Sequence, residues 1–400
     1  MPIPRLYDVL LTEHLQAHRQ MVFVTGPRQV GKTTTCRRLD PRCKYLNWDD
    51  EDDRRLITRG PSAIVAALSL GQLSDRPALL VIDEIHKYRR WRTLLKGLFD
   101  KHADRLRIVV TGSSRMDVYR RGGDSLMGRY LLYRMHPLSV GELVHPGLLA
   151  REVRPPERLG PRRFKALYKH GGFPEPYAKD DSRFSRRWRS LRFAQLVRED
   201  VRDLSPIQDL AQLELAFALL RERSGCQLSY SSLARNVNVS VDTVRRWVAA
   251  ACTLHYGFLV RPWFRNVAKS LRKEPKWFLR DWSAISDPGQ RYETFVACHL
   301  LKSVQAWQDA GLGDYELRYL RDKDKREVDF LVVRDGEPWF MVEAKQSEAR
   351  LSDHLAHFQR QTRARHAFQA VLSRNHVAAS CFGRTDPCVV PASTLLSQLP

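Results

Sequence analysis

The stretch Met21–Leu39 carries the residues whose types and spacing point most directly to chemistry. Its centre matches the phosphate-binding pattern G-x-x-x-x-G-K-[ST]. In such a loop, backbone N–H groups surround the phosphates, the lysine reaches the β- and γ-phosphates, and the last hydroxyl joins the Mg²⁺ shell. An ordinary glycine turn is the alternative, but the apolar run before the loop and the breaker-free stretch after it read as a strand and a helix. The pattern therefore predicts a nucleoside triphosphate site formed by Gly26, Pro27, Arg28, Gln29, Val30, Gly31, Lys32, Thr33 and Thr34.

Two adjacent carboxylates close the next strongly apolar run, Ala78–Ile82. We expect Asp83 to hold Mg²⁺, directly or through water, and Glu84 to orient and polarise the attacking water. Four apolar residues followed by two acids are common in proteins. The position gains weight because ligand sites lie at the carboxyl ends of parallel strands. The run is therefore interpreted as a Walker B strand, with Lys32 and Glu84 as catalytic residues.

Two further positions are candidates for contact with the transferred phosphate. Ser113 or Ser114 follows the apolar run Arg107–Thr111 and would sense the γ-phosphate if that run neighbours the Walker B strand; simple turn residues are the alternative. Phosphoryl transfer often uses an arginine from a neighbouring subunit. We expect Arg129 to supply it, with Arg115 as the second choice, and a surface arginine without a role as the alternative for each.

A second set of acids lies in the last third of the chain. Asp329 lies on one strand of a predicted hairpin, and Glu343 and Lys345 lie two residues apart, hence on one side, of the returning strand. This set resembles the PD-(D/E)xK nuclease core. Asp329 and Glu343, with Glu293 from the preceding helix, would hold Mg²⁺, and Lys345 would activate water or stabilise the phosphate. All four positions are intact, which favours a working site, although such folds are also kept as binding platforms.

Several motifs together resemble a widespread prokaryotic family of AAA+-type ATPases. They read GPRQVGKTT, LLVIDEIHK, VVTGSSR, LMGRYLLYRMHPLSVGEL and GGFPEPY. In that family a winged-helix region and a C-terminal nuclease-like domain follow the ATPase. The resemblance implies a parallel sheet of the ASCE type and ATP as the nucleotide. In AAA+-type ATPases the place of Arg129 faces the next subunit's nucleotide, so we expect a homo-oligomer, possibly ring-shaped.

The elements that must position these residues predict an α/β protein with several domains. We expect a P-loop NTPase domain with a parallel sheet at residues 1–150, a helical lid and linker at 151–206, a winged helix-turn-helix at 207–284 and a restriction-endonuclease-like domain at 285–400. Pro155-Pro156 and Gly160-Pro161 punctuate the first boundary. The last stretch, 351–369, reads as a basic helix.

Helix, tight turn and helix follow one another between residues 212 and 254, which is the arrangement of DNA-reading domains. Residues 259–264 and 277–279 would pair as the wing. Six positive charges near the wing would contact phosphates. Such regions also serve as spacers between domains, so DNA binding and a purely connecting role both remain open. The six charges are Arg265, Lys269, Arg272, Lys273, Lys276 and Arg280.

The composition favours a polyanionic partner. The chain has 67 Lys and Arg residues against 45 Asp and Glu, a formal net charge of +22, which points to DNA, although a preference for Arg codons would account for part of it. The seven cysteines show no C-x-x-C pair and no zinc spacing, as expected of reduced thiols in a cytoplasmic protein. We expect no membrane partner, because no apolar run approaches the ~18 residues of a membrane span.

Two functions follow from these patterns. The first is an ATP-hydrolysing AAA+-type protein that acts on DNA and carries a Mg²⁺-dependent nuclease site. The second is a nucleotide-switched regulator or scaffold that binds DNA or protein and has an inactive nuclease-like domain.

Overall fold

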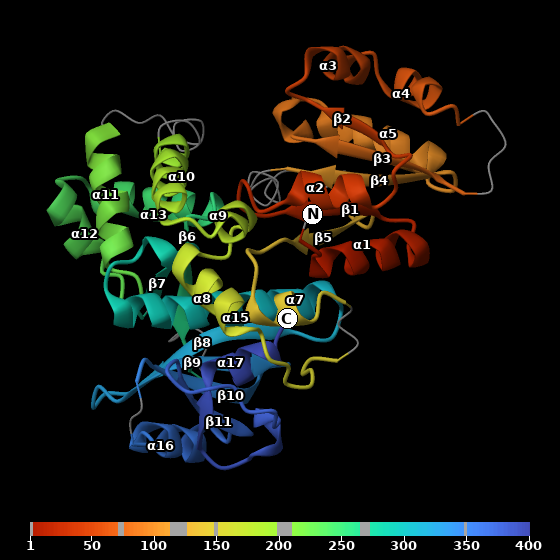
Figure 1. Ribbon diagram of the computed structural model, residues 1–400. Helices are drawn as coiled ribbons and strands as arrows, with labels where there is room; N and C mark the ends of the chain where they lie inside the picture. The colour runs from red at the N-terminus through yellow and green to blue at the C-terminus, as the bar shows by residue number, and fades with distance from the viewer. Residues whose placement is uncertain are drawn as a thin grey trace. The chain divides into compact units, whose positions relative to one another are not determined.

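The computed structural model describes residues 3–70, 76–112, 126–147, 151–197, 210–264, 273–347 and 350–400. The chain divides into two compact units, Met1–His136 with Pro146–Leu148, and Pro137–His145 with Leu149–Pro400 (Figure 1). Among the described helices, none is long and apolar enough to cross a membrane. The boundaries of the four sequence-based domains stay predictions.

The first unit is built on a parallel five-stranded sheet with the order β2-β3-β4-β1-β5. The strands are β1 (Met21–Thr25), β2 (Lys44–Asn47), β3 (Ala78–Asp83), β4 (Leu106–Thr111) and β5 (Tyr130–Arg134). The helices are α1 (Leu6–Ala17), α2 (Lys32–Arg38), α3 (Glu51–Thr58), α4 (Pro61–Ala67) and α5 (Trp91–His102), with the short 3₁₀ turn η1 (Ile85–Lys87). The strands predicted around the loop and the acids are confirmed.

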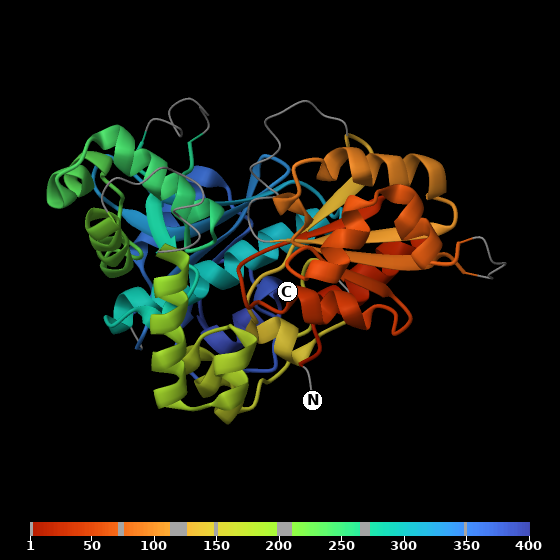
Figure 2. The same ribbon diagram turned by 90° about the horizontal axis from the view of Figure 1, so that it is seen from above.

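Helices cover both faces of this sheet. Alternate side chains of the strands, such as Phe23 and Ile82, pack with Ile57, Ile64 and Leu95 from α3, α4 and α5. The α1 and α2 helices contact β1, β3 and β4 on the other face. Figure 2 shows α1 and α5 on opposite sides of the strands. Burial on both faces explains why the strands read as continuous apolar runs.

The strand order brings the carboxyl ends of β3 and β4 together. Asp83 pairs with Thr111 in the register of these two strands, and Asn47 of β2 lies on the other side of Asp83. The condition under which Ser113 or Ser114 would reach the phosphate is therefore met. Ser113, Ser114 and Arg115 themselves lie outside the described residues.

The second unit contains a mixed seven-stranded sheet with the order β12-β11-β10-β9-β8-β6-β7. Its strands are β6 (Gly257–Pro262), β7 (Lys276–Leu279), β8 (Tyr315–Arg321), β9 (Glu327–Arg334), β10 (Glu337–Lys345), β11 (His366–Val371) and β12 (Cys388–Pro391). The long helix α15 (Pro288–Asp309) contacts β7 to β10. The predicted hairpin of β9 and β10 is confirmed, with Val342 opposite Phe330.

The remaining helices of the second unit include the predicted helix, turn and helix. They are α7 (Val140–Val144), α8 (Pro161–His170), α9 (Pro174–Lys179), α10 (Ser182–Gln195), α11 (Leu210–Glu222), α12 (Tyr230–Val237), α13 (Val241–Thr253), α16 (Asp353–Thr362) and α17 (Ala392–Ser397), with the 3₁₀ turns η4 (Trp282–Ala284) and η5 (Cys381–Gly383). Ser229 and Ser240 cap α12 and α13 with their side chains. The predicted cap at Ser229 is confirmed.

Three expectations for this unit need correction or remain open. Strands β6 and β7 pair as predicted and form an antiparallel hairpin, but β6 also pairs with β8, so the hairpin is the edge of the large sheet. The predicted helix at 351–369 ends with α16, because the fully buried β11 pairs in parallel with β10. The α8, α9 and α10 helices belong to the second unit, and a role as a nucleotide lid stays a prediction.

Candidate functional site

The backbone of the phosphate-binding loop explains its glycines. Gly26 has a φ of 148°, and a Cβ on it would lie 2.2 Å from the carbonyl oxygen of Met135. Gly31 has a φ of 102°, in the left-handed region that side chains avoid. An exposed residue between them, Gln29, also has a positive φ of 63°. The loop therefore depends on glycine at both ends, as the spacing predicts.

Lys32 is held by the loop itself. Its buried side chain donates from Nζ to the carbonyl oxygens of Gly26 and Pro27, each at 2.9 Å. Burial lowers the pKa of this ammonium group to about 8, and the charges of Glu84 and Asp83 act in the opposite direction. The two acceptors are neutral carbonyls, so an anionic phosphate is a stronger partner for this lysine.

Asp83 is surrounded by hydroxyl groups from three separate segments. Its Oδ2 accepts hydrogen bonds from Thr33 Oγ1 at 2.7 Å and from the Tyr45 hydroxyl at 2.9 Å. Its Oδ1 accepts from Thr111 Oγ1 at 2.6 Å. Hydroxyl and carboxylate oxygens are ligands that Mg²⁺ prefers, and Thr33 and Asp83 lie in direct contact. These two residues fit a Mg²⁺ ion that also binds phosphate oxygens.

Glu84 follows Asp83 in a strained backbone conformation. Its φ is 54°, and non-glycine residues in this region cluster at functional sites. The Oε2 atom lies 3.5 Å from His86 Nε2 and 4.0 Å from Lys87 Nζ. Burial raises the pKa of this carboxyl group, and the charge of Asp83 raises it further. A carboxylate with a raised pKa is suited to accept a proton from water.

Sequence reasoning missed Arg5, which precedes the first helix. Its buried guanidinium donates from Nη1 to the Val30 carbonyl and from Nη2 to the His136 carbonyl, both at 2.6 Å. A Cβ added to Gly31 would lie 3.3 Å from the same Nη1 atom. Arg5 therefore connects the phosphate-binding loop, at Val30, to the segment that follows β5, at His136. No motif marks it, because its partners are distant backbone atoms.

Arg129 lies at the amino-terminal edge of the sheet, next to the start of β5. It forms a two-point ion pair with Asp100 of α5, with Nε to Oδ1 at 2.6 Å and Nη2 to Oδ2 at 3.1 Å. The hydrogen bond from Arg129 holds the pKa of Asp100 below its usual value. In this chain the arginine is thus far from its own loop, and its action on a neighbouring subunit stays a prediction.

The second set of acids is gathered around Lys276 of β7. Lys276 Nζ lies 2.6 Å from Glu327 Oε1, 2.9 Å from Glu293 Oε1 and 3.6 Å from Asp329 Oδ1. We call these four residues the Lys276 cluster. Burial by itself lowers the pKa of Lys276, but the three carboxylates outweigh it and hold the pKa above its ordinary value. The sequence-based expectation that Lys276 contacts DNA phosphate is therefore wrong.

The other members of the predicted nuclease set have partners of their own. Asp329 Oδ2 accepts a hydrogen bond from the Ala344 backbone N–H at 2.9 Å. Glu343 Oε1 lies 2.7 Å from Lys345 Nζ. Among the described residues, no group of three or more His, Cys, Asp or Glu side chains is arranged to hold a metal ion. In this arrangement Glu293 and Asp329 pair with Lys276 and Glu343 pairs with Lys345, and a role for these acids in Mg²⁺ binding stays a prediction.

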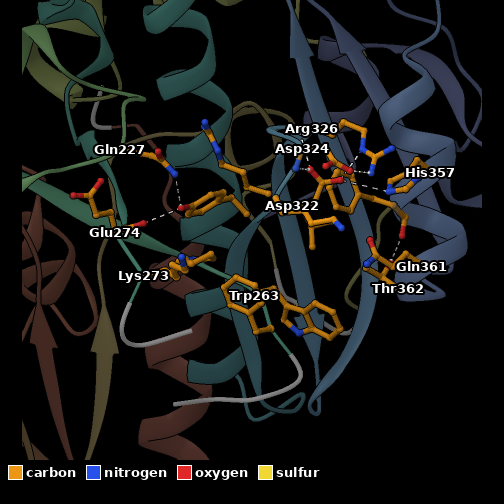
Figure 3. A pocket seen from close by; sticks show the side chains of 17 residues that line it. Gln227, Trp263, Lys273, Glu274, Asp322, Asp324, Arg326, His357, Gln361 and Thr362 are labelled. Carbon is orange, nitrogen blue, oxygen red and sulfur yellow. Dashed lines mark hydrogen bonds and ion pairs between the residues drawn. The ribbon is translucent and has the colours of Figure 1, made fainter. Parts of the chain in front are cut away.

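A cavity of about 990 Å³ lies beside the Lys276 cluster (Figure 3). The ring of Tyr319, which lines it, lies 5.7 Å from Lys276 Nζ, and Arg321, also in its wall, pairs with Glu327 at 2.8 Å. The Tyr319 hydroxyl accepts a hydrogen bond from Gln227 Nε2 and donates one to the Glu274 backbone carbonyl. Figure 3 shows Asp322 with Arg326 and His357 on another part of the wall. The described lining residues do not include the carboxylates of the cluster.

Family comparisons agree with the first unit and assign no activity to the second. Residues 18–144 match the family described as an AAA domain. Residues 161–286 and 288–387 match two families described as domains of unknown function, DUF8612 and DUF4143. Uncharacterised proteins of Mycobacterium bovis and Mycobacterium tuberculosis are each 26% identical over 337 residues, which is 80% of this chain and 69% of theirs.

Solved structures show similarity at low identity. The Aeropyrum pernix Orc1 protein in complex with DNA has a TM-score of 0.32 and 16% identity, covering 73% of this chain and 91% of that chain. AMPPCP-bound DnaA from Aquifex aeolicus has a TM-score of 0.32 and 14% identity, covering 63% and 92%. The segment that matches an AAA domain, residues 18–144, contains the phosphate-binding loop and the acids Asp83 and Glu84.

Proposed function

We propose that the protein hydrolyses ATP at the phosphate-binding loop and uses this reaction as a switch for DNA binding by the second unit. The observation that carries the ATPase proposal is the 2.7 Å hydrogen bond between Thr33 and Asp83, directly beside Lys32. Lys32 would bind the β- and γ-phosphates, and Thr33 and Asp83 would hold Mg²⁺. The metal ion would neutralise phosphate charge. Glu84 would polarise the attacking water and accept its proton.

The ATPase proposal is tested by Glu84→Gln, which keeps the shape of the side chain but not its basicity. We expect hydrolysis to fall by about 10²-fold or more, because positioned general bases contribute about 10²–10⁴-fold. Binding of a fluorescent ATP analogue should stay close to wild type. Glu51→Gln, an exposed acid on α3, is the matched control and should behave as wild type. Wild-type turnover in Glu84→Gln would refute the assignment of Glu84.

We further infer that α12 and α13, with the β6–β7 hairpin, form a winged helix that binds DNA. The apolar sides of both helices are buried, and Arg235, Arg245 and Arg246 are exposed on their other sides. The side chain of Arg245 is 63% exposed and that of its ion-pair partner Asp242 is 84% exposed. Exposed arginines on a second helix of this kind suit contact with phosphates and base edges.

Charge reversal tests this second proposal. Arg245→Glu with Arg246→Glu should weaken binding to a labelled duplex and flatten the dependence of log K on log salt, because each lost phosphate contact lowers the slope by about 0.9. The matched control reverses the exposed Arg360 and Arg365 around the end of α16. An equal loss in both variants would show a diffuse charge effect instead of a defined interface. An unchanged slope in both would favour the connecting role.

The geometry favours the second of the two functions considered above, the regulator without cleavage. Its support is the pairing of Glu293 and Asp329 with Lys276 and of Glu343 with Lys345. Incubation of the purified protein with duplex, branched and single-stranded DNA in Mg²⁺ or Mn²⁺, with and without ATP, tests this choice. Cleavage that disappears in Asp329→Asn would restore the nuclease hypothesis.

A further inference from the structure

We propose that the ammonium group of Lys276 is the resident cation of the Lys276 cluster, and that removing it converts the cluster into a divalent-cation site. This inference does not depend on the ATPase proposal. It concerns a part of the second unit whose acidic residues predict a metal site from the sequence. In the tertiary structure, a lysine from an earlier segment of the chain lies among these acids instead.

The direction of the Lys276 side chain follows from its position on β7. Side chains alternate along β7, so Trp277 and Leu279 point one way and Lys276 and Phe278 the other. Trp277 and Leu279 belong to the apolar core formed by α11, α12 and α13. Phe278 contacts the ring of Phe330 on β9. Lys276 is therefore directed to the side of β7 that faces β9 and α15.

Three carboxylates surround the ammonium group of Lys276. Glu293 comes from α15, and Glu327 and Asp329 lie two residues apart on β9, hence on one side of that strand. The three N–O distances of 2.6, 2.9 and 3.6 Å match an ammonium group with two close hydrogen bonds and one looser ion pair. They exceed the ~2.1 Å of Mg²⁺–oxygen bonds. Lysine thus occupies the centre of three carboxylates.

These carboxylates have little capacity left to accept a further ligand. Glu327 binds Lys276 through Oε1 and Arg321 through Oε2. Asp329 binds Lys276 through Oδ1 and the Ala344 N–H through Oδ2. Glu293 Oε2 lies against Gly225: a Cβ placed on this glycine would be 3.1 Å from that oxygen.

Lys276 is only 4% exposed, and a buried ammonium group requires nearby negative charge because desolvation is costly. The same rule applies in reverse when the lysine is removed. Three carboxylates from α15 and β9 would then lie together without their shared cation, and a divalent ion with oxygen preference would relieve their repulsion.

The test measures Mn²⁺ binding by electron paramagnetic resonance in the nucleotide-free full chain. Asp83→Asn is present in every sample, so that the nucleotide site does not contribute. With Lys276 intact, we expect no Mn²⁺ binding that depends on Asp329. Lys276→Met should bind one Mn²⁺ per chain, at least about tenfold more tightly than any residual Mn²⁺ binding of the protein with Lys276 intact, because the metal would take over a site of three buried carboxylates. Mn²⁺ should also raise the melting temperature of this variant.

Matched variants separate this effect from a general loss of a buried lysine. Lys302 is also buried and pairs with the carboxylate of Glu142. Lys302→Met should therefore gain no Mn²⁺ site. Adding Asp329→Asn to Lys276→Met should abolish the new site, and circular dichroism should confirm that the variants are folded.

Two results would overturn the proposal. The first is Mn²⁺ binding that occurs with Lys276 intact and is lost in Asp329→Asn. It would show that the lysine and a bound metal ion belong together to one working site. The second is a folded Lys276→Met protein without Mn²⁺ binding. The intact-lysine measurement stands even if Lys276→Met fails to fold.

Discussion

The phosphate-binding site and the Lys276 cluster contain the same types of side chain, a lysine and several acids at the ends of strands. In the first site, Asp83 accepts hydrogen bonds only from the neutral hydroxyls of Thr33, Tyr45 and Thr111 among the described contacts, and Lys32 donates to neutral carbonyls. In the cluster, the lysine and the acids bind one another.

This difference teaches how a site remains able to bind charged ligands. Neutral hydroxyls and carbonyls satisfy a buried polar group, yet they can be exchanged for a metal ion or a phosphate at modest cost. A buried ammonium among carboxylates has already gained the electrostatic energy that a metal would bring, and separating the groups would leave uncompensated charge. We therefore expect charge pairing to set the behaviour of each lysine and arginine in the two regions.

The largest expected effect concerns Arg129, whose partner is an exposed acid. Its ion pair with Asp100 is accessible to water, so the arginine can leave it for the phosphates of a neighbouring subunit at little cost. If it does so, Arg129→Ala should retain ATP binding and lose on the order of 10³-fold in hydrolysis. Steady-state turnover and analogue binding measure the two effects.

Asp100→Asn is the matched control for Arg129. It breaks the same ion pair but leaves the arginine, so hydrolysis should stay near wild type. Mixing Arg129→Ala with Lys32→Ala subunits should restore part of the activity, because some interfaces then pair an intact loop with an intact arginine. A monomer that hydrolyses ATP normally, or equal losses in Arg129→Ala and Asp100→Asn, would show that Arg129 has only a structural role.

The next effect concerns Lys32, which is expected to behave in the opposite way to Lys276. Lys32→Ala should weaken ATP binding and reduce hydrolysis by about 10²–10³-fold, as for other removed donors to developing charge. Lys276→Met should instead add a binding site for a cation. Isothermal titration calorimetry with ATP measures the first effect. Wild-type ATP affinity in Lys32→Ala would remove the contrast between the two lysines.

A smaller effect is expected for Arg5, the positioning residue behind the loop. Arg5→Met leaves the Val30 and His136 carbonyls without this donor, at a cost of about 1–3 kcal/mol for a buried group, so we expect the KM for ATP to rise about tenfold. The kcat should change much less, and Arg5→Lys should restore part of the affinity. Arg42→Met, an exposed control, should match wild type. A fall in kcat alone would argue against positioning of the loop.

The smallest effect is a pH dependence of ATP binding. The pKa of Lys32 is lowered to about 8, mainly by burial, so the free protein loses this proton as pH rises through 8. ATP phosphates favour the charged ammonium, so affinity should decline above that pH and binding should be accompanied by proton uptake. Calorimetry at pH 8 in two buffers of different ionisation enthalpy measures the uptake. Lys32→Ala should show none.

The sequence by itself determined the elements that carry the nucleotide chemistry. The loop spacing marks Gly26, Gly31 and Lys32, and the apolar runs of β1, β3 and β4 are continuous because these strands are buried on both faces. The helices α11 to α13 and the β9–β10 hairpin also follow from local periodicity, capping and turn residues. Such features depend on neighbours along the chain, so they can be predicted without the fold.

Only the tertiary structure decided which side chains meet. Strand order places Thr111 and Tyr45 on Asp83, and Arg5 reaches the loop from a segment without a motif. Lys276 belongs to a basic stretch that looks solvated in sequence, yet the pairing of its strand at the sheet edge turns it toward Glu293 and Asp329. Long-range register and packing set these contacts, and because they join residues far apart along the chain, local pattern does not encode them.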